Sequence, residues 1–177
     1  MNGRTIVAML IAAGIGAGAA FAQVKEEKPA APANRPAATA TATFAGGCFW
    51  CTEADFDKVD GVISTTSGYI GGKTANPTYD SVSAGNSGHA EAVQVVYDPS
   101  KVTYSKLLEY YWRTIDPTTK DRQFCDSGSP YRTAIFVHDE QQRALAEASK
   151  RAVGGKRTAG GTTVREMDHD KTFYPAE

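Results

Sequence analysis

Short apolar runs, separated by glycine, proline and aspartate, recur in the second part of the chain and predict β-strands. The strongest run covers residues 90–97, where Glu91, Val93 and Val95 share one face and Asp98-Pro99 closes the strand. Further strands are predicted at residues 42–45, 62–70, 133–138 and 162–164.

Apolar residues at helical spacing predict three helices between these strands. The first follows the Gly46-Gly47 break and ends near Asp60-Gly61, and the second covers residues 104–115. The third begins at Asp139, which can cap it, with Gln142 at the reciprocal position. On the buried faces of the first two helices we expect Phe49, Trp50, Phe56, Val59, Leu107, Leu108, Tyr111, Trp112 and Ile115.

The order of these elements, β-α-β-β-α-β-α-β, predicts the fold class. The connections between successive strands are too long for simple hairpins, and helices occupy most of them. We therefore expect an α+β protein, a two-layer sandwich in which helices pack on a mixed β-sheet.

Changes in composition divide the chain into three parts. Residues 1–22 are typical of an export signal, because Arg4 supplies a positive start, an apolar core follows, and Ala20-Phe21-Ala22 is a small-residue cleavage site. We expect cleavage after Ala22 and a periplasmic location. Residues 23–41 form a Pro/Ala-rich linker, and residues 42–177 form one folded domain.

The overall composition is ordinary for a globular protein, with 41% hydrophobic and 22% charged residues and a formal net charge of −1. No basic run could follow a phosphate backbone, so nucleic acid is not an expected partner. We expect a monomer. The three cysteines, Cys48, Cys51 and Cys125, are too few for a disulfide scaffold. They indicate either a thiol that reacts or one structural disulfide beside an inert thiol.

The sharpest local pattern is Gly46-Gly47-Cys48-Phe49-Trp50-Cys51, which places a thiol at the start of a predicted helix. A helix N-terminus stabilises a thiolate, the form of cysteine that attacks other atoms. By itself, C-x-x-C indicates a dithiol redox pair, half of a zinc site or a structural bridge. A general thiol-disulfide oxidoreductase that uses Cys48 and Cys51 is therefore one alternative.

A zinc site would need two further ligands besides the C-x-x-C pair. The remaining candidates are scattered without paired spacing: Cys125, His89, His138 and His169. We therefore predict no metal site, and we interpret His89 as a structural residue.

Several spaced motifs together resemble the methionine sulfoxide reductase A family, and they occur in that family's order. The resemblance covers residues 42–177. It implies the family's α+β, ferredoxin-like fold and a catalytic domain that reduces the S epimer of methionine sulfoxide, free or within proteins, in the repair of oxidative damage. The motifs are Gly46-Gly47-Cys48-Phe49-Trp50, Gly68-Tyr69-Ile70-Gly71-Gly72, Asn76-Pro77-Thr78-Tyr79, Gly88-His89-Ala90-Glu91-Ala92-Val93 and Tyr131-Arg132-Thr133-Ala134-Ile135.

Reduction of a sulfoxide needs a nucleophile for the sulfur and a proton donor for the oxygen. The resemblance implies Cys48 as the nucleophile and Glu91 as the acid. Glu91 lies on the apolar face of its strand, where desolvation would keep its carboxyl group protonated near neutral pH. The resemblance also implies that substrate is bound by Phe49, Trp50, Tyr79, Asp126 and Tyr131.

The sulfenic acid left on Cys48 must then be attacked by a second thiol. Cys51 is three residues away, so the disulfide loop is small, and we expect Cys51 to resolve the sulfenic acid first. Cys125 adjoins Asp126 and could serve as a second resolving cysteine. A thioredoxin-like protein is the expected reductant, and no bound cofactor is expected, because the electrons come from thiols alone.

Overall fold

The computed structural model describes residues 38–157, 164–168 and 172–177. The predicted export signal and the predicted linker up to residue 37 lie outside these residues. The first strand begins at Ala40, two residues before the expected start of the domain. The elements in chain order are β1 (Ala40–Gly46), α1 (Phe49–Phe56), β2 (Val62–Ile70), α2 (Tyr79–Ser83), β3 (Ala90–Tyr97), α3 (Tyr104–Thr114), β4 (Arg122–Gln123), β5 (Asp126–Ser127), the 3₁₀ helix η1 (Ser129–Tyr131), β6 (Thr133–Val137), α4 (Glu140–Arg157), β7 (Arg165–Asp168) and β8 (Tyr174–Pro175).

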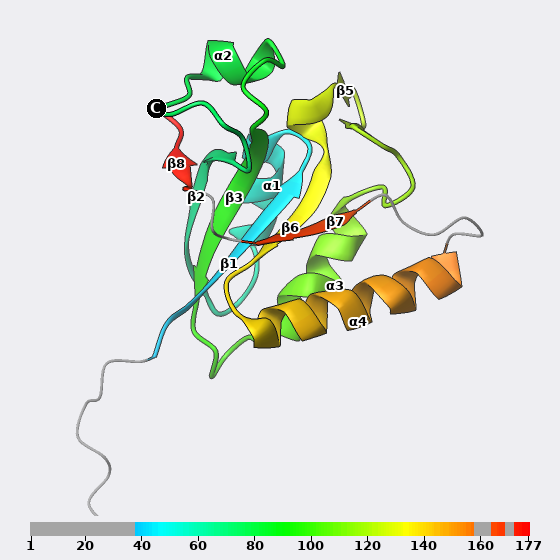
Figure 1. Ribbon diagram of the computed structural model, residues 1–177. Helices are drawn as coiled ribbons and strands as arrows, with labels where there is room; N and C mark the ends of the chain where they lie inside the picture. The colour runs from blue at the N-terminus through cyan, green and yellow to red at the C-terminus, as the bar shows by residue number, and fades with distance from the viewer. Residues whose placement is uncertain (1–37, 158–163, 169–171) are drawn as a thin grey trace, which may run out of the picture. The chain divides into compact units, whose positions relative to one another are not determined.

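Six of the strands form one mixed sheet, in the spatial order β7-β6-β1-β3-β2-β8 (Figure 1). β1 pairs antiparallel with both β3 and β6, and β3 pairs antiparallel with β2. β7 runs parallel to β6 at one edge, and β8 adds to β2 at the other. The expected α+β fold, with helices packed on a mixed sheet, is confirmed.

The main core joins α1 and α3 to the sheet through stacked aromatic rings. The Phe44 ring of β1 lies 5.0 Å from the Phe56 ring of α1 and 5.1 Å from the Tyr111 ring of α3, centroid to centroid. The Tyr111 hydroxyl donates a hydrogen bond of 2.8 Å to the Ala45 carbonyl, so its polar end is satisfied. Each such side chain contributes about 1.5–3 kcal/mol by its burial.

A second, smaller core covers part of the sheet and consists of Ala45, Ile70, Ala90, Ala92, Ala134 and Phe136, with Phe173 packed against it. The side chains of β3 therefore point alternately into the two cores, Ala90 and Ala92 into this one and Val93 and Val95 into the main one. The strand lacks a polar face for this reason, and Glu91 is buried within it.

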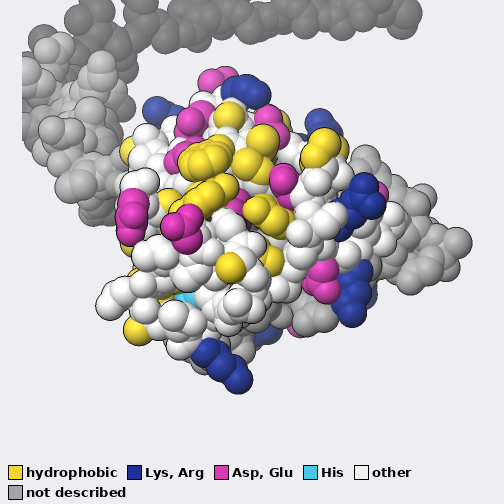
Figure 2. All heavy atoms as spheres, turned by 90° about the horizontal axis from the view of Figure 1, so that it is seen from above, with side chains coloured by type: hydrophobic (Ala, Val, Ile, Leu, Met, Phe, Trp, Pro, Cys, Tyr) yellow, Lys and Arg dark blue, Asp and Glu magenta, His cyan; other side chains and the backbone are white. Residues whose placement is uncertain are grey.

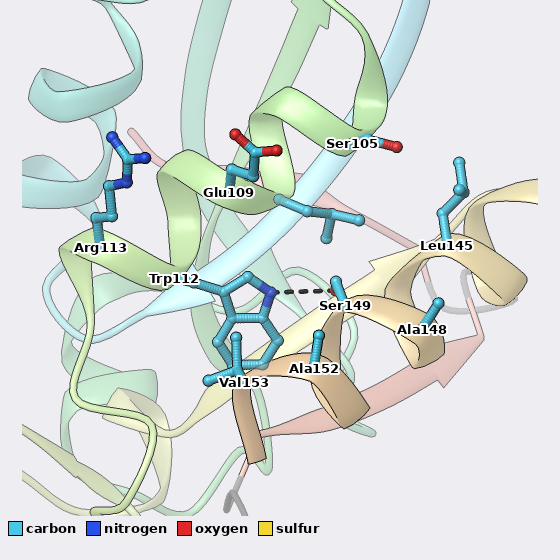
Figure 3. Close-up of a pocket in the computed structure, with 10 residues that line it drawn as sticks. Ser105, Glu109, Trp112, Arg113, Leu145, Ala148, Ser149, Ala152 and Val153 are labelled. Atoms are coloured by element: carbon cyan, nitrogen blue, oxygen red, sulfur yellow. Dashed lines mark hydrogen bonds between the residues drawn. The ribbon is translucent and has the colours of Figure 1, made fainter. Parts of the chain in front are cut away.

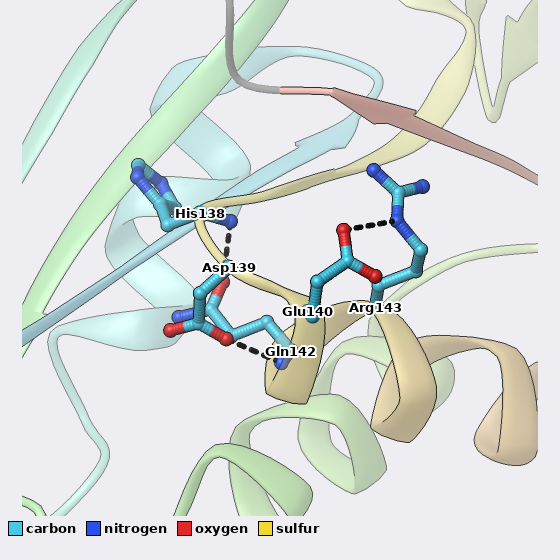
Figure 4. Close-up of polar contacts among 5 residues, drawn as sticks. All are labelled: His138, Asp139, Glu140, Gln142 and Arg143. Atoms are coloured by element: carbon cyan, nitrogen blue, oxygen red, sulfur yellow. Dashed lines mark hydrogen bonds and ion pairs between the residues drawn. The ribbon is translucent and has the colours of Figure 1, made fainter.

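The start of α4 follows the predicted capping pattern with one difference (Figure 4). The Gln142 main-chain N–H donates to Asp139 Oδ1 at 2.7 Å, as a capping residue requires. The Gln142 side chain reaches back one residue further than expected, because its Oε1 accepts the His138 N–H at 3.0 Å. Its Nε2 donates to the Thr41 carbonyl at 2.7 Å and so fixes α4 to the start of β1.

Two predicted elements differ from the structure. The first helix ends at Phe56 rather than near Asp60, and Trp50 is 58% exposed, so its expected place on the buried helix face is wrong. The last predicted strand, residues 162–164, differs at Val164, which precedes β7 instead of lying in a strand; residues 162–163 lie outside the described residues. Within the described part of the chain, no helix is both long and apolar enough to cross a membrane.

Candidate active site

Cys48 lies at the N-terminal end of α1, as the sequence predicts. It is the N-cap residue, with φ −55° and ψ 118°, and Phe49 is the first residue of the helix. The turn before it depends on Gly47, whose φ of +91° lies in the left-handed region. The first N–H groups of a helix have no partners within it and attract negative charge. The local sequence thus places a thiol at the positive end of α1.

Gln123 holds a distant loop against this turn. A Cβ atom on residue 47 would lie 2.6 Å from the Gln123 Cβ, so only glycine permits the approach. The Gln123 side chain is 1% exposed. It pairs with the Asp116 main chain in both directions, because Asp116 N–H donates to Oε1 and Nε2 donates to the Asp116 carbonyl, each at 2.8 Å. This amide pair fixes the neighbouring β4 and β5 beside Cys48, and no sequence pattern had singled out Gln123.

Glu91 reaches the same helix end from β3. The Phe49 main-chain N–H donates to Glu91 Oε2 at 3.0 Å. Burial raises the pKa of Glu91; the hydrogen bond from Phe49 opposes this shift, and the negative charge of Asp126 adds to it. The prediction that Glu91 is desolvated on an apolar strand face is confirmed. The Glu91 carboxyl group is therefore hydrogen-bonded to the residue that directly follows Cys48.

Cys48 precedes α1 and Cys51 lies in its first turn, close enough for the two side chains to interact. This interaction raises the pKa of Cys51, as do its partial burial and the negative charges of Asp126 and Asp55. All three cysteines are free thiols. The helical turn thus brings together the two cysteines that the sequence predicted as a reacting pair.

Three aromatic side chains extend from this point to the surface. The Phe49 ring is buried, and the Trp50 ring lies 5.1 Å from it. The Tyr79 ring, from α2, stacks on Trp50 at 5.6 Å and lies 6.3 Å from Phe49. Trp50 and Tyr79 are 58% and 41% exposed. Together the rings form a continuous apolar wall that begins beside Cys48 and ends in solvent.

Tyr131 and Asp126 complete the set of predicted site residues around Glu91. Burial raises the pKa of Tyr131, with further contributions from Glu91, Tyr79 and Asp126, whereas a hydrogen bond with Ser83 lowers it. The negative charge of Asp126 raises the pKa values of Cys51, Glu91 and Tyr131 alike. Residues far apart in the sequence therefore meet near the N-terminal end of α1.

Tyr69 also lies at this site, although the sequence motif that contains it does not by itself predict a role for it. It lies directly opposite Glu91 in the β2–β3 register, and its ring centroid is 5.6 Å from that of Phe49. Burial, with contributions from Glu91, Glu177 and Tyr79, raises the pKa of Tyr69 to about 12. The hydroxyl of Tyr69 is therefore neutral at any physiological pH.

Two other residues singled out in the sequence lie at the edge of this site. Cys125 is exposed in the loop between β4 and β5, and it makes no hydrogen bond within the described part of the chain. His89 is buried, accepts the Gly72 N–H on Nδ1 at 3.2 Å and bonds the Thr74 carbonyl through Nε2 at 2.8 Å. His89 thus holds the loop after β2, in agreement with its structural interpretation.

Two further features bear on what the site can be. Among the described residues, no group of three or more histidine, cysteine, aspartate or glutamate side chains could hold a metal ion. A cavity of about 410 Å³ lies between α3 and α4, where Trp112 Nε1 donates to Ser149 Oγ at 3.1 Å (Figure 3). None of the predicted site residues lines this cavity.

The fold and the site together define a cysteine-dependent oxidoreductase. Its thiol pair is open to solvent, a buried carboxylic acid lies beside the pair, and neutral tyrosines and an apolar wall surround both. The comparisons with known proteins identify the family. Residues 40–177 match the family model described as peptide methionine sulfoxide reductase.

Relatives and solved structures agree with this match. A peptide methionine sulfoxide reductase MsrA of Ligilactobacillus salivarius is 49% identical over 137 residues, which are 77% of this chain and 80% of that protein. One of Bacillus pumilus is 51% identical over 136 residues, 77% of this chain and 76% of that protein. The crystal structure of Mxr1 from Saccharomyces cerevisiae in reduced form has a TM-score of 0.73 at 30% identity, covering 81% of this chain and 82% of that one. Methionine sulfoxide reductase A of Corynebacterium diphtheriae has a TM-score of 0.68 at 32% identity, covering 81% and 72%. This chain belongs to the peptide methionine sulfoxide reductase family.

Proposed function

We propose that this protein reduces the S epimer of methionine sulfoxide, free and within proteins, with Cys48 as the nucleophile and Glu91 as the acid. The observation that carries the proposal is the hydrogen bond between the Phe49 N–H and the buried Glu91 carboxyl, which places an acid beside a thiol at a helix N-terminus. The Cys48 sulfur attacks the sulfoxide sulfur while Glu91 gives its proton to the oxygen. A sulfur–sulfur bond to Cys48 forms as the sulfur–oxygen bond breaks and the oxygen leaves as water. Water then attacks the Cys48 sulfur, the sulfur–sulfur bond breaks, methionine leaves, and Cys48 becomes a sulfenic acid.

The surrounding side chains suit the other parts of the substrate. Phe49 and Trp50 form an apolar cup for the methyl group, which carries no hydrogen-bonding atom. Tyr79 and Tyr131 donate hydrogen bonds to the sulfoxide oxygen, and a raised pKa keeps Tyr131 protonated for this role. Asp126, half-buried beside them, helps to hold the pKa of Glu91 above its usual range.

Cys51 is the first resolving cysteine. It lies in the first turn of the helix that Cys48 precedes, close enough for the two side chains to interact, so attack on the sulfenic acid needs no large movement of α1. The attack releases water and leaves a Cys48–Cys51 disulfide. The exposed Cys125 serves as a second resolving cysteine. A thioredoxin-like dithiol then reduces the disulfide by thiol exchange and returns both cysteines to thiols.

Counting thiols tests the reductase function directly. The reduced protein, incubated with methionine sulfoxide and no other reductant, should lose titratable thiols in proportion to the methionine formed, and Cys48→Ser should form none. A general thiol-disulfide oxidoreductase would instead keep its thiols in the presence of the sulfoxide. Methionine formation by Cys48→Ser at the parental rate would refute the nucleophile assignment.

Peptide mapping tests the order of the cysteines. One equivalent of methionine sulfoxide should give a Cys48–Cys51 disulfide, and Cys51→Ser should slow recycling with thioredoxin more than Cys125→Ser does. If Cys51→Ser recycled normally while Cys125→Ser stopped as a sulfenic acid, the order of the two would be reversed.

We further propose that the protein is exported and acts in the periplasm. The support is the sequence of residues 1–22, with Arg4, its apolar core and the small residues before Gln23. An exported domain would receive electrons from a thioredoxin-like protein on its own side of the membrane. The native protein should therefore begin at Gln23 when its mass is measured. A cytosolic protein that retains residues 1–22 would contradict this.

A further inference from the structure

The β4–β5 hairpin has an unusual residue at its tip. β4 pairs antiparallel with β5 through Arg122–Ser127 and Gln123–Asp126, so Phe124 and Cys125 are the two loop residues. Phe124 has a φ of +49°, in the left-handed region. Two-residue hairpin loops with a positive φ at the first position strongly favour glycine, asparagine or aspartate there. A bulky side chain at this position is strained.

The fold itself gives no reason for a phenylalanine at this position. Its side chain is 72% exposed, more than any other large hydrophobic side chain of the described residues. The backbone is held by neighbours instead, because Gln123 is paired with Asp116 and the Arg122 guanidinium bonds the Phe124 carbonyl at 3.4 Å. A side chain that is both strained and unpacked indicates a role outside the core.

This hairpin tip lies at the rim of the active site. Gln123 packs against Gly47, immediately before Cys48 in the chain. On the other side of the tip, the negative charge of Asp126 raises the pKa of Cys51. Phe124 lies in the loop between Gln123 and Asp126. Figure 2 shows this end of the molecule, where apolar side chains gather with acidic side chains around them.

The geometry favours a polypeptide substrate as the partner of this rim. The ring contacts run without a break from buried Phe49 through Trp50 to Tyr79, so the exposed aromatic surface continues the wall of the substrate pocket. When the oxidised methionine belongs to a polypeptide, the residues on either side of it must cross the rim. Exposed aromatic side chains bind such segments by burying apolar area at low cost in conformational entropy.

We propose that Phe124 is a docking residue for the polypeptide that carries the oxidised methionine, and that free methionine sulfoxide does not use it. The proposal rests on the reductase function proposed above and adds a residue that separates the two kinds of substrate. Asp126 and Asp55 near the rim make neutral or cationic flanking residues better partners than acidic ones.

The test compares two substrates in single turnovers of pre-reduced protein without added reductant, followed as loss of thiols. One is N-acetyl methionine sulfoxide, and the other is a terminally blocked heptapeptide with alanine, valine and leucine around a central methionine sulfoxide. Phe124→Gly and Phe124→Ala should lower the second-order rate constant for the heptapeptide about five- to tenfold, the effect of losing a partly buried aromatic contact. The constant for N-acetyl methionine sulfoxide should change by less than about twofold.

Two controls separate docking from misfolding. Phe124→Gly suits the left-handed backbone, so it should melt no lower than the parent while it still loses activity on the heptapeptide. Ile63→Ala removes another exposed apolar side chain, 56% exposed on β2, and should change neither rate constant.

An equal loss on both substrates would overturn the proposal, because Phe124 would then shape the pocket itself. Unchanged rates on both, together with a raised KM for thioredoxin in steady-state assays, would also overturn it and assign the rim to the reductant. Failure of the parent protein to lose thiols with either substrate would refute the reductase function itself, and the docking proposal with it.

Discussion

Replacing Glu91 with glutamine should affect activity and stability in opposite directions. Glutamine has nearly the same size, and its Oε1 can still accept the Phe49 N–H now bonded at 3.0 Å. It cannot supply the proton that the departing oxygen needs. Loss of a general acid slows such a step by about 100-fold, or about 2.7 kcal/mol in activation free energy. The rate of the first turnover should therefore fall by that factor near neutral pH.

The pH dependence follows from the direction of the pKa shift. Burial raises the pKa of Glu91, so the folded protein holds this proton to a higher pH than the unfolded chain does. The parental rate should decline as pH rises through the raised pKa of Glu91, because the donor is lost. The rate of Glu91→Gln should lack this decline, since it has no proton to lose at that position.

The stability of the folded protein depends on pH through the same carboxyl group. Between the unfolded and folded pKa values of Glu91, ionisation favours the unfolded state, so the free energy of unfolding of the parent falls as pH rises. A tenfold difference in proton affinity between the two states corresponds to about 1.4 kcal/mol, and Glu91→Gln should escape this loss above that range. The new amide N–H₂ group needs a partner, which reduces the gain.

Stopped-flow single turnovers and urea titrations at several pH values measure both effects. Glu53→Gln is the matched control, because Glu53 lies on α1 and bonds Ser67 Oγ at 2.8 Å outside the site. It should keep the parental turnover rate. An unchanged single-turnover rate in Glu91→Gln would refute the assignment of Glu91 as proton donor. If the free energy of unfolding of the parent did not fall with rising pH relative to that of Glu91→Gln, the raised pKa of Glu91 would be refuted.

Two further predictions concern the backbone that positions the site. Gly47→Ala should destabilise by about 2–4 kcal/mol, because a left-handed φ and a Cβ 2.6 Å from the Gln123 Cβ both oppose it. Gly85→Ala is the control for the backbone strain alone, since the φ of Gly85 is +79° but nothing lies within 4 Å of an added Cβ. If urea titrations gave equal losses of unfolding free energy for the two variants, packing of residue 47 against Gln123 would be unimportant. Asp139→Ala should cost about 1 kcal/mol through loss of its 2.7 Å bond to the Gln142 N–H, and an unchanged denaturation midpoint would contradict its role as a cap.

The sequence by itself determined the features that depend on local periodicity. The alternation of β3 placed Glu91 on the same face as Val93 and Val95, and all three are buried. The glycines before Cys48 and the apolar spacing after it fixed a helix that begins next to that residue. These predictions succeed because a side chain's direction follows from the period of its own strand or helix.

Only the tertiary structure decided which distant segments meet at the thiol pair. No periodicity indicates that two-residue strands pair around Phe124, or that Gln123 packs against Gly47. Tyr69 joins the site only because the β2–β3 register places it opposite Glu91. Trp50 has the spacing of a core residue but is exposed, because α1 is only 8 residues long and packs on the sheet through its other side chains. Such contacts depend on how loops close and which strand edges pair, and the local pattern of apolar residues carries no record of either.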